Sequence, residues 1–253
     1  LSLRRQRQMC IRDSYQAAHR LHDTALLLKV HPSNYKISGF TEEASVEALS
    51  SVGPPIIADL GSGFIDEACH WLREGRPSWL RDEPAVKQTL QSGAALVTFS
   101  CDKLFGGPQA GVIAGRKDLI ETCAKHPLMR AVRPGALVLN ALQETALAYL
   151  RRDGDAIPFW RMAQTPVAEL ETRAQSLGVG NPISTMSMTG GGSLPGEEFP
   201  SAGIEIEGDV SKELRNAQVP VIARVRDQST ILDLRTVHPD DDAAVAKAIA
   251  SAI

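Results

Sequence analysis

The sequence predicts an α/β fold, with a mainly parallel sheet in a large N-terminal domain and a smaller α/β domain at the C-terminal end. Short apolar runs such as 55–58 and 94–99 alternate with segments of helical periodicity, as in βαβ units. Both runs end in polar residues and glycines, which is expected where buried strands reach the ligand-binding edge of such a sheet. The order of elements changes after Asp153, which indicates the second domain.

The elements of the first domain follow from local patterns. Thr41 is followed by two glutamates and an apolar pattern at Val46 and Leu49, which predicts a helix start. The segment 137–151 has apolar residues at helical spacing and predicts a long helix. The other expected elements are helices at 15–23, 83–92 and 117–125 and strands at 24–30, 55–58, 94–99 and 110–114.

The second domain is predicted from a different order of elements. The segment 158–176 is expected to be helical, and Gly190–Gly192 is expected to form a flexible turn between domains. An extended segment, a hairpin split by Asp227 and Gln228, and a final helix with acidic residues at its N-terminal end complete the domain. The extended segment is 202–206, the hairpin strands are 219–225 and 230–234, and the final helix is preceded by 239–242.

The composition excludes several classes of protein. At 253 residues the chain can bury one large core or two small ones. No apolar run approaches the ~20 residues that cross a bilayer, and we expect a cytoplasmic location. The cysteines have no CxxC spacing and the histidines are scattered, so no metal site is predicted. A net charge of −3 does not predict nucleic-acid binding; such a partner would need a local basic patch or a further domain.

Lys103 is the first candidate for chemistry. It follows an apolar run that ends in Ser100, Cys101 and Asp102, and a Gly-Gly-Pro turn comes next. Its amine is therefore expected on a loop at the end of a strand. A lysine that attacks a carbonyl needs such a place, because its surroundings must make a neutral amine available. Taken alone, the pattern also fits a surface lysine after a strand.

Asp59 is the second candidate, in the similar segment Pro55–Gly63. Ligands of open parallel sheets bind at the carboxyl ends of the strands, so Asp59 and Lys103 are expected to share one crevice. An aspartate that keeps a pyridine nitrogen protonated and a lysine that holds an aldehyde are what a pyridoxal phosphate (PLP) enzyme needs most. Asp59 alone would also fit a turn or a helix N-cap, but the ordered pair favours PLP.

These two segments and four others resemble one family. The chain is similar to the bacterial selenocysteine synthases, the L-seryl-tRNA(Sec) selenium transferases, which are PLP-dependent enzymes of fold type I. The resemblance runs from about Tyr15 to the C-terminus, and its Asn34 and Lys103 segments are the most specific. The other matching segments are Thr24–Glu43, His126–Arg133, Gly190–Pro195 and Leu232–Thr236.

The resemblance implies a reaction. Lys103 would hold PLP as an internal aldimine until the amino group of a tRNA-bound serine displaces it, and would then take the Cα proton as general base. Asp59 would keep the ring nitrogen protonated. Loss of the β-hydroxyl would give an aminoacrylate, to which selenophosphate would supply selenium. The product would be selenocysteinyl-tRNA(Sec).

Further cofactor contacts are expected beside Lys103. Asn34 follows the first strand, where fold-type I enzymes often place a polar side chain against the phenolic oxygen of PLP; a turn role is the alternative. Ser100 ends the strand before Lys103 and is predicted to contact the cofactor. Asp102 is predicted to act beside Lys103, by tuning the amine or binding a substrate group, or else it caps a turn.

Four arginines are candidates for binding anions. Arg130 and Arg133 are three residues apart and would face one side if the segment were helical. The resemblance implies that they bind the anion of the selenium donor. As a bare pattern they also fit a solvated basic face. Arg224 and Arg235 fall on the C-terminal hairpin, where this fold class often binds a substrate carboxylate. That carboxyl is esterified in seryl-tRNA, so neither arginine is assigned.

The chain departs from the family pattern in two ways. Cys101 stands where the family usually has glycine, and its Cβ would crowd the cofactor loop if φ were positive. The resemblance begins well inside the family's large domain, so we expect the family's N-terminal part, with a tRNA-contacting domain, to be missing from this fragment. We expect residues 1–14 to be a non-native or disordered leader, 15–153 a partial PLP-binding large domain and 154–253 the small domain. We therefore expect this fragment alone to be inactive and to bind PLP weakly.

Two alternative functions stay open. One is a related PLP-dependent lyase that acts on a small amino acid or an amino sugar phosphate. The other is a truncated, non-catalytic chain that can at most associate with full-length partners. If the main interpretation holds, the resemblance implies a homo-oligomer, a ring built from dimers.

Overall fold

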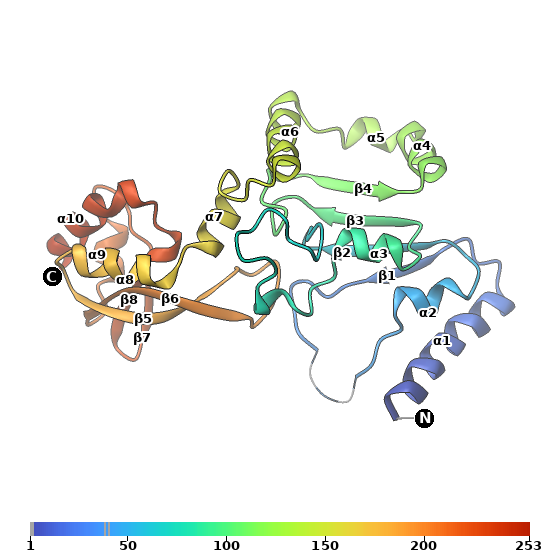
Figure 1. Ribbon diagram of the computed structural model, residues 1–253, viewed down its shortest axis with the longest axis horizontal. Coiled ribbons are helices and arrows are strands. Elements are labelled where there is room, and N and C mark those ends of the chain that lie inside the picture. Colours follow the sequence, from blue (N-terminus) through green and yellow to red (C-terminus); the bar gives the residue numbers. More distant parts are fainter. Residues whose placement is uncertain (1–2, 38, 40) are drawn as a thin grey trace. The chain divides into compact units, whose positions relative to one another are not determined.

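The computed structural model describes residues 3–37, 39 and 41–253, with side chains from residue 10 onward (Figure 1). The described chain divides into two compact units. Unit 1 comprises the residues up to Ile157 together with Gly190–Gly196, and unit 2 comprises Pro158–Thr189 and Glu197–Ile253. The segment 190–196 thus belongs to the first unit, although its neighbours in the sequence belong to the second.

Unit 1 is built on a four-stranded sheet. Its strands are β1 (Leu27–Val30), β2 (Ile56–Gly61), β3 (Leu96–Ser100) and β4 (Gly111–Gly115), in the order β1-β2-β3-β4. The first three are parallel and β4 is antiparallel to β3 (Figure 1), which confirms the predicted mainly parallel sheet. Alternate residues of β2 are buried in the core of the unit, which leaves Asp59 half-buried on the other face.

The helices of unit 1 occur largely where the patterns predict them, but two begin later. Ser45 caps α2, since its Oγ accepts a hydrogen bond from the amide of Ala48, so this helix does not start at Thr41. α3 does not start at Glu83, because Glu83 is buried and precedes Pro84. The helices are α1 (Leu3–Leu21), α2 (Val46–Ser50), the 3₁₀ turn η1 (Ser78–Leu80), α3 (Val86–Gln91), α4 (Lys117–Lys125), α5 (Leu128–Ala131) and α6 (Ala136–Arg151).

The segment 1–14, expected to be a non-native or disordered leader, is helical from Leu3 onward, in α1. Whether it is non-native stays a prediction. The helix begins at Leu3, and its residues include many of high helical propensity, such as arginine, glutamine and methionine. Two of its apolar side chains, Ile11 and Tyr15, pack against the core of unit 1. That packing explains why the segment is helical although its apolar residues show no clear period.

Unit 2 contains an antiparallel sheet with the order β5-β6-β8-β7. Side chains of α8, α9 and α10 share one core with β6 and β8, so helices cover one face of this sheet (Figure 1). The strands are β5 (Asn181–Met188), β6 (Glu198–Glu207), β7 (Arg224–Arg226) and β8 (Ser229–Asp233). The helices are α7 (Pro158–Gln164), α8 (Val167–Ser176), α9 (Ser211–Arg215) and α10 (Asp242–Ala252), with 3₁₀ turns η2 (Leu234–Thr236) and η3 (Pro239–Asp241).

The prediction for unit 2 was wrong in three places. The single helix expected over 158–176 is divided into α7 and α8, because Pro166 adopts an extended conformation at the start of α8. The strand expected over 219–225 is confined to Arg224–Arg226. β5 was not predicted, since its serines, threonine and methionines give no clear alternation.

Candidate active site

The carboxyl ends of β1, β2 and β3 form the candidate site in unit 1. Because these strands are parallel, the loops that follow them leave the same edge of the sheet. The amide of His31, directly after β1, donates a hydrogen bond to the carbonyl of Asp59 on β2 (2.8 Å). The partner of Asp59 on β3 is Thr98, and β3 leads into the turn that carries Lys103. The structure thus brings Asp59 and Lys103 to one edge, as expected.

Asp59 is held by a neighbour that the sequence analysis did not single out. Its Oδ1 accepts a hydrogen bond from Thr98 Oγ1 at 3.0 Å. The two side chains are on the same face of the sheet because their residues are register partners. A polar residue in the apolar run 96–99 was the available signal. Thr98 therefore fixes the orientation of the carboxyl group that was assigned to the pyridine nitrogen.

Glycine at position 61 permits a close approach at the end of β2. Gly61 has φ +69°, and a Cβ built there would lie 2.4 Å from Ser33 Oγ in the loop after β1. Any side chain would therefore strain the backbone and collide with that loop. Asn34, the predicted contact of the PLP phenolic oxygen, is the next residue in this loop and is exposed.

Lys103 occupies the turn that follows β3. Its side chain is 26% exposed, and its Nζ lies 3.4 Å from Oδ1 of Asp102. The turn is held from both sides, since the amide of Leu104 donates to the carbonyl of Ser62 and the amide of Gly106 donates to the carbonyl of Lys103, both at 2.8 Å. Ser100 ends β3, where it pairs with Gly111 of β4. Its predicted contact with the cofactor stays a prediction.

Cys101, which was expected to depart from the family pattern, fits its position in the fold. It is absent from the residues with positive φ, and its side chain is fully buried in the core of unit 1. The Cβ of Cys101 therefore does not crowd the cofactor loop, because it points into the core. Burial raises the pKa of the Cys101 thiol to about 11.

The loop 190–196 contacts Lys103. Gly192 lies so close to the lysine stem that a Cβ built on it would be 2.9 Å from Lys103 Cε and 3.3 Å from Cδ. The next two residues, Ser193 and Leu194, are buried and anchor the loop in unit 1. The prediction of a turn here is confirmed, but its contact with the candidate lysine was missed, because nothing local in the sequence indicates it.

Gly192→Ala should displace the lysine amine with little effect on stability. The flexible stem of Lys103 can move away from the new methyl group, so we expect the free energy of unfolding to change by less than about 1 kcal/mol. The rate at which Lys103 captures PLP should fall about tenfold, because small misplacements of a reacting group are costly. Borohydride trapping followed by peptide mass spectrometry measures that rate.

Gly191→Ala is the matched control for this change. A Cβ at Gly191 would have no atom within 4 Å, so we expect the capture rate of the parent chain. Equal capture rates in the two variants would contradict a role for Gly192 in placing the amine.

Arg130 and Arg133 are distant in the sequence from the strand ends, and no polar contact among the residues that the structure describes joins them to the candidate site. Arg130 is in α5, which is drawn between α4 and α6 on the β4 side of the sheet (Figure 1). α5 ends at Ala131, so Arg133 lies beyond it and the two arginines do not share one helix. Both side chains are exposed. In the described part of the chain, no hydrogen bond or ion pair joins either arginine to Asp59 or Lys103.

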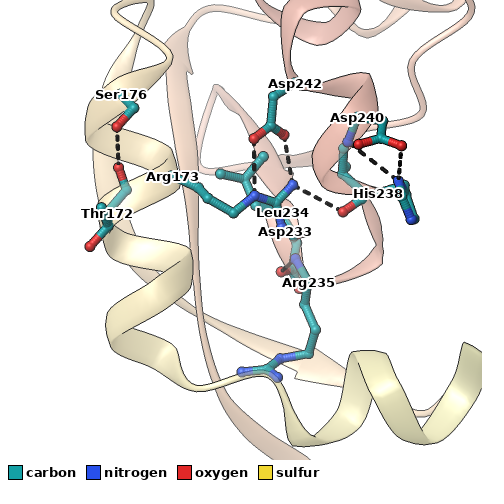
Figure 2. Close-up of polar contacts among 10 residues, drawn as sticks. Thr172, Arg173, Ser176, Asp233, Leu234, Arg235, His238, Asp240 and Asp242 are labelled. Carbon is teal, nitrogen blue, oxygen red and sulfur yellow. Dashed lines mark hydrogen bonds and ion pairs between the residues drawn. The ribbon is translucent and has the colours of Figure 1, made fainter. Parts of the chain in front are cut away.

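Arg235 is part of the interior of unit 2. It is 5% exposed, and its guanidinium donates to the carbonyls of Met162 (2.9 Å), Thr165 (2.8 Å) and Pro200 (2.7 Å). Burial lowers the pKa of this guanidinium. Figure 2 also shows a second arginine of unit 2, Arg173, whose guanidinium is paired with Asp242. Because the side chain is buried and its two terminal nitrogens donate to carbonyls of unit 2, Arg235 has a structural role there.

Arg224 differs from Arg235 in exposure. Its side chain is 46% exposed and lies 3.6 Å from Oδ2 of Asp233, and it donates to the carbonyl of Met186 at 3.1 Å. It lines a hollow of about 490 Å³ on unit 2. Of the two arginines on the C-terminal hairpin, Arg224 is the one that solvent can reach.

Neither a metal site nor a membrane span is found in the described residues. No group of three or more histidine, cysteine, aspartate or glutamate side chains in that part of the chain is arranged to hold a metal ion. None of the helices described there has the length and apolar character needed to cross a bilayer.

Comparison with known proteins gives one family. The model of the L-seryl-tRNA selenium transferase family matches residues 7–238, so residues 7–14, which were set aside as a leader, lie inside the match. An L-seryl-tRNA(Sec) selenium transferase of Moorella thermoacetica is 40% identical over 255 residues, covering 91% of this chain and 53% of the relative. One from Geobacter metallireducens is 38% identical over 263 residues, covering 95% and 55%. The chain thus spans about half the length of the curated relatives it matches.

A solved structure shares the fold. D-Glucosaminate-6-phosphate ammonia-lyase matches with a TM-score of 0.52 and 22% identity, over 90% of this chain and 57% of the lyase. At this identity the likeness shows the fold alone. It agrees with the predicted α/β fold class.

Proposed function

The chain belongs to the L-seryl-tRNA selenium transferase family, and from this premise we propose that it serves the PLP-dependent conversion of seryl-tRNA(Sec) to selenocysteinyl-tRNA(Sec). The selenium donor would be selenophosphate. The observation that carries the proposal is the placement of Asp59 and Lys103 at adjacent strand ends of one parallel sheet, within a chain matched by the family along most of its length.

The residue types at the strand ends fit PLP. An amine and a half-buried carboxyl group leave the same sheet edge, and the carboxyl is oriented by Thr98. Gly61 and Gly192 let Ser33 and the stem of Lys103 approach the backbone closely, since a Cβ at either glycine would collide with them. Lys103 would hold the aldehyde carbon of PLP, and Asp59 would hold the proton on its ring nitrogen. Asn34 and Ser100 are proposed as further contacts.

The chain's own groups would then handle binding and proton transfer. PLP supplies an electron sink for the bond broken at Cα of the serine. Lys103 would take and return the Cα proton as general base and acid, with Asp102 at 3.4 Å from its amine stabilising the charged form. Asp59 would keep the ring nitrogen protonated throughout, because Thr98 holds its carboxyl group in one orientation.

Arg130 and Arg133 are proposed to bind selenophosphate. Two exposed guanidiniums near each other in sequence suit an oxyanion. Within the described chain, no hydrogen bond or ion pair joins either arginine to Lys103. They would therefore serve the Lys103 site of the same chain only after α5 moves, or else the site of a neighbouring subunit. The second possibility agrees with the proposed dimer-based ring, in which a cytoplasmic homo-oligomer shares residues between subunits.

Arg130→Ala and Arg133→Ala should weaken selenophosphate binding. Each lost charge-assisted contact is worth ~1.5–3 kcal/mol, so we expect kcat/KM for selenophosphate to fall about tenfold or more, with the KM for seryl-tRNA(Sec) unchanged. Steady-state kinetics with each substrate varied in turn measures both. Lys117→Ala, which removes a lysine whose side chain is 91% exposed, is the control. A rise in KM for the tRNA alone would assign the arginines to that substrate.

The proposed function has a direct test. The intact protein as encoded, loaded with PLP, should form selenocysteinyl-tRNA(Sec) from seryl-tRNA(Sec) and selenophosphate, detected after hydrolysis of the aminoacyl ester. If it instead released ammonia from a small amino acid or an amino sugar phosphate and left the tRNA unchanged, the lyase alternative would replace this proposal.

A further inference from the structure

Glu83 is a buried acidic residue that the reaction outlined above does not use. Its side chain is 3% exposed, in the segment between η1 and α3. A carboxyl group at this depth needs polar partners, because burying it unpaired would forfeit its hydration without replacement. Glu83 has two. Its Oε1 accepts a hydrogen bond from the hydroxyl of Ser62, and its Oε2 lies 3.5 Å from Nε2 of His31.

The two partners belong to different loops of the candidate site. His31 directly follows β1, and its amide donates to the carbonyl of Asp59. Ser62 directly follows β2 and is fully buried. The Glu83 side chain therefore joins the segments that leave two neighbouring strands at the edge where Asp59 lies.

Ser62 extends the connection to the third loop. Its carbonyl accepts the amide of Leu104, the residue after Lys103, at 2.8 Å. A continuous chain of contacts thus runs from the carboxyl group of Glu83, through the side chain and carbonyl of Ser62, to the turn that carries the lysine.

Glu83 is itself fixed by its surroundings. Its amide donates to the carbonyl of Leu80 at 3.1 Å, and its carbonyl accepts from the guanidinium of Arg76 at 3.2 Å. The same guanidinium group bonds the carbonyls of Leu80 and Arg81 and lies over the ring of Phe64. The carboxyl group is therefore presented from a rigid segment, as a residue that positions others must be.

We propose that Glu83 is a positioning residue that sets the separation of Asp59 and Lys103 by holding the loops after β1 and β2 in register with the lysine turn. That this separation matters for catalysis rests on the proposed function. The structural link from Glu83 to the lysine turn is independent of it. Buried ionisable groups contribute little net stability compared with apolar residues of similar size. A purely stabilising role therefore predicts a different result from a positioning role.

Hydrogen exchange tests the link without any cofactor. In the full chain, free of PLP, Glu83→Leu should raise the exchange rate of the Leu104 amide at least tenfold, because Ser62 is no longer held. The amide of Val97, in the middle of β3, should keep its rate. Ser62→Ala should give the same pattern, while Glu83→Gln, which can still pair with the hydroxyl, should restore protection of Leu104. Unchanged exchange at Leu104 in Glu83→Leu would overturn the proposal.

PLP binding tests the consequence. Glu83→Leu should raise the dissociation constant of PLP about tenfold while the melting temperature stays within a few degrees of the parent value, and Glu83→Gln should restore it. Glu67→Gln is the control, since Glu67 is 45% exposed and pairs with the same Arg76. Faster Leu104 exchange with unchanged PLP affinity would overturn the positioning role. A PLP site that responds as expected in a protein with no transferase activity would count against the proposed function alone.

Should Glu83→Leu fail to fold, the same two measurements on Ser62→Ala decide the question. That variant removes only a hydroxyl group and leaves the carboxyl group in place. Faster exchange of the Leu104 amide together with weaker PLP binding would support the proposal. An exchange rate or a PLP dissociation constant equal to that of the parent protein would overturn it.

Discussion

Lys103→Ala is expected to abolish covalent attachment of PLP and to remove transferase activity. Lys103 is the amine that leaves the sheet edge beside Asp59, and its stem is placed by the contact with Gly192. Loss of the proton-transfer group alone should lower the rate by ~10²–10⁴-fold, and loss of the attachment point adds to that. Borohydride reduction followed by peptide mapping should find PLP on the Lys103 peptide of the parent and on no peptide of the variant.

The control for this experiment is a lysine elsewhere in the same unit. Lys87 is half-exposed, and its amine pairs with Asp66 at 2.7 Å. Lys87→Ala should keep the attachment and the activity of the parent. PLP fixed by borohydride in equal amounts in Lys103→Ala would assign the attachment to another residue and undo the mechanism proposed for this site.

Arg235→Ala is expected to have the largest effect on stability. It would leave the carbonyls of Met162, Thr165 and Pro200 without their donor inside unit 2, and each unsatisfied buried group costs ~1–3 kcal/mol. The guanidinium also stacks on Phe199 at 5.2 Å. A total loss of about 3 kcal/mol or more is large against a domain stability of ~5–15 kcal/mol. Chemical denaturation monitored by circular dichroism measures it.

Arg224→Ala provides the matched comparison on the same hairpin. Its side chain is half-exposed and its ion pair with Asp233 is long, at 3.6 Å, so we expect a change within ~1 kcal/mol. Similar losses for the two variants would mean that the interior contacts of Arg235 contribute no more than those of a surface arginine.

The parts of the fold that could be predicted from sequence are those set by local pattern. β2 and β3 are apolar runs that end in glycine or polar residues, and the helix at 117–125 was predicted at its observed bounds. β5 could not be predicted, because its pairing with β6 decides its conformation while its own residues alternate only weakly. The start of α3 was predicted too early, because a glutamate such as Glu83 is typical of a helix start. Its burial, which the sequence does not show, is what places it before the helix.

The sequence predicted the two central residues of the candidate site but not the residues that hold them in place. Asp59 lies near the end of β2 and Lys103 follows β3, so the rule for parallel sheets brings both to one edge. Thr98, Glu83 and Gly192 act through contacts with residues that are distant in the sequence. Thr98 is 39 residues from Asp59, and Glu83 is 21 residues from Ser62. Local sequence patterns carry no information on such contacts. The difference between Arg224 and Arg235 is likewise a matter of burial alone.

The burial of Cys101 determines how the site behaves toward thiol reagents and oxidants. The thiolate is the reactive form of cysteine, and with a pKa of about 11 the thiol beside Asp102 and Lys103 stays protonated at neutral pH. Cys69, with a pKa of about 12, is equally unreactive. Alkylation would therefore report first on the exposed Cys10. A cysteine next to the lysine thus adds no redox sensitivity to a site proposed to handle a selenium nucleophile.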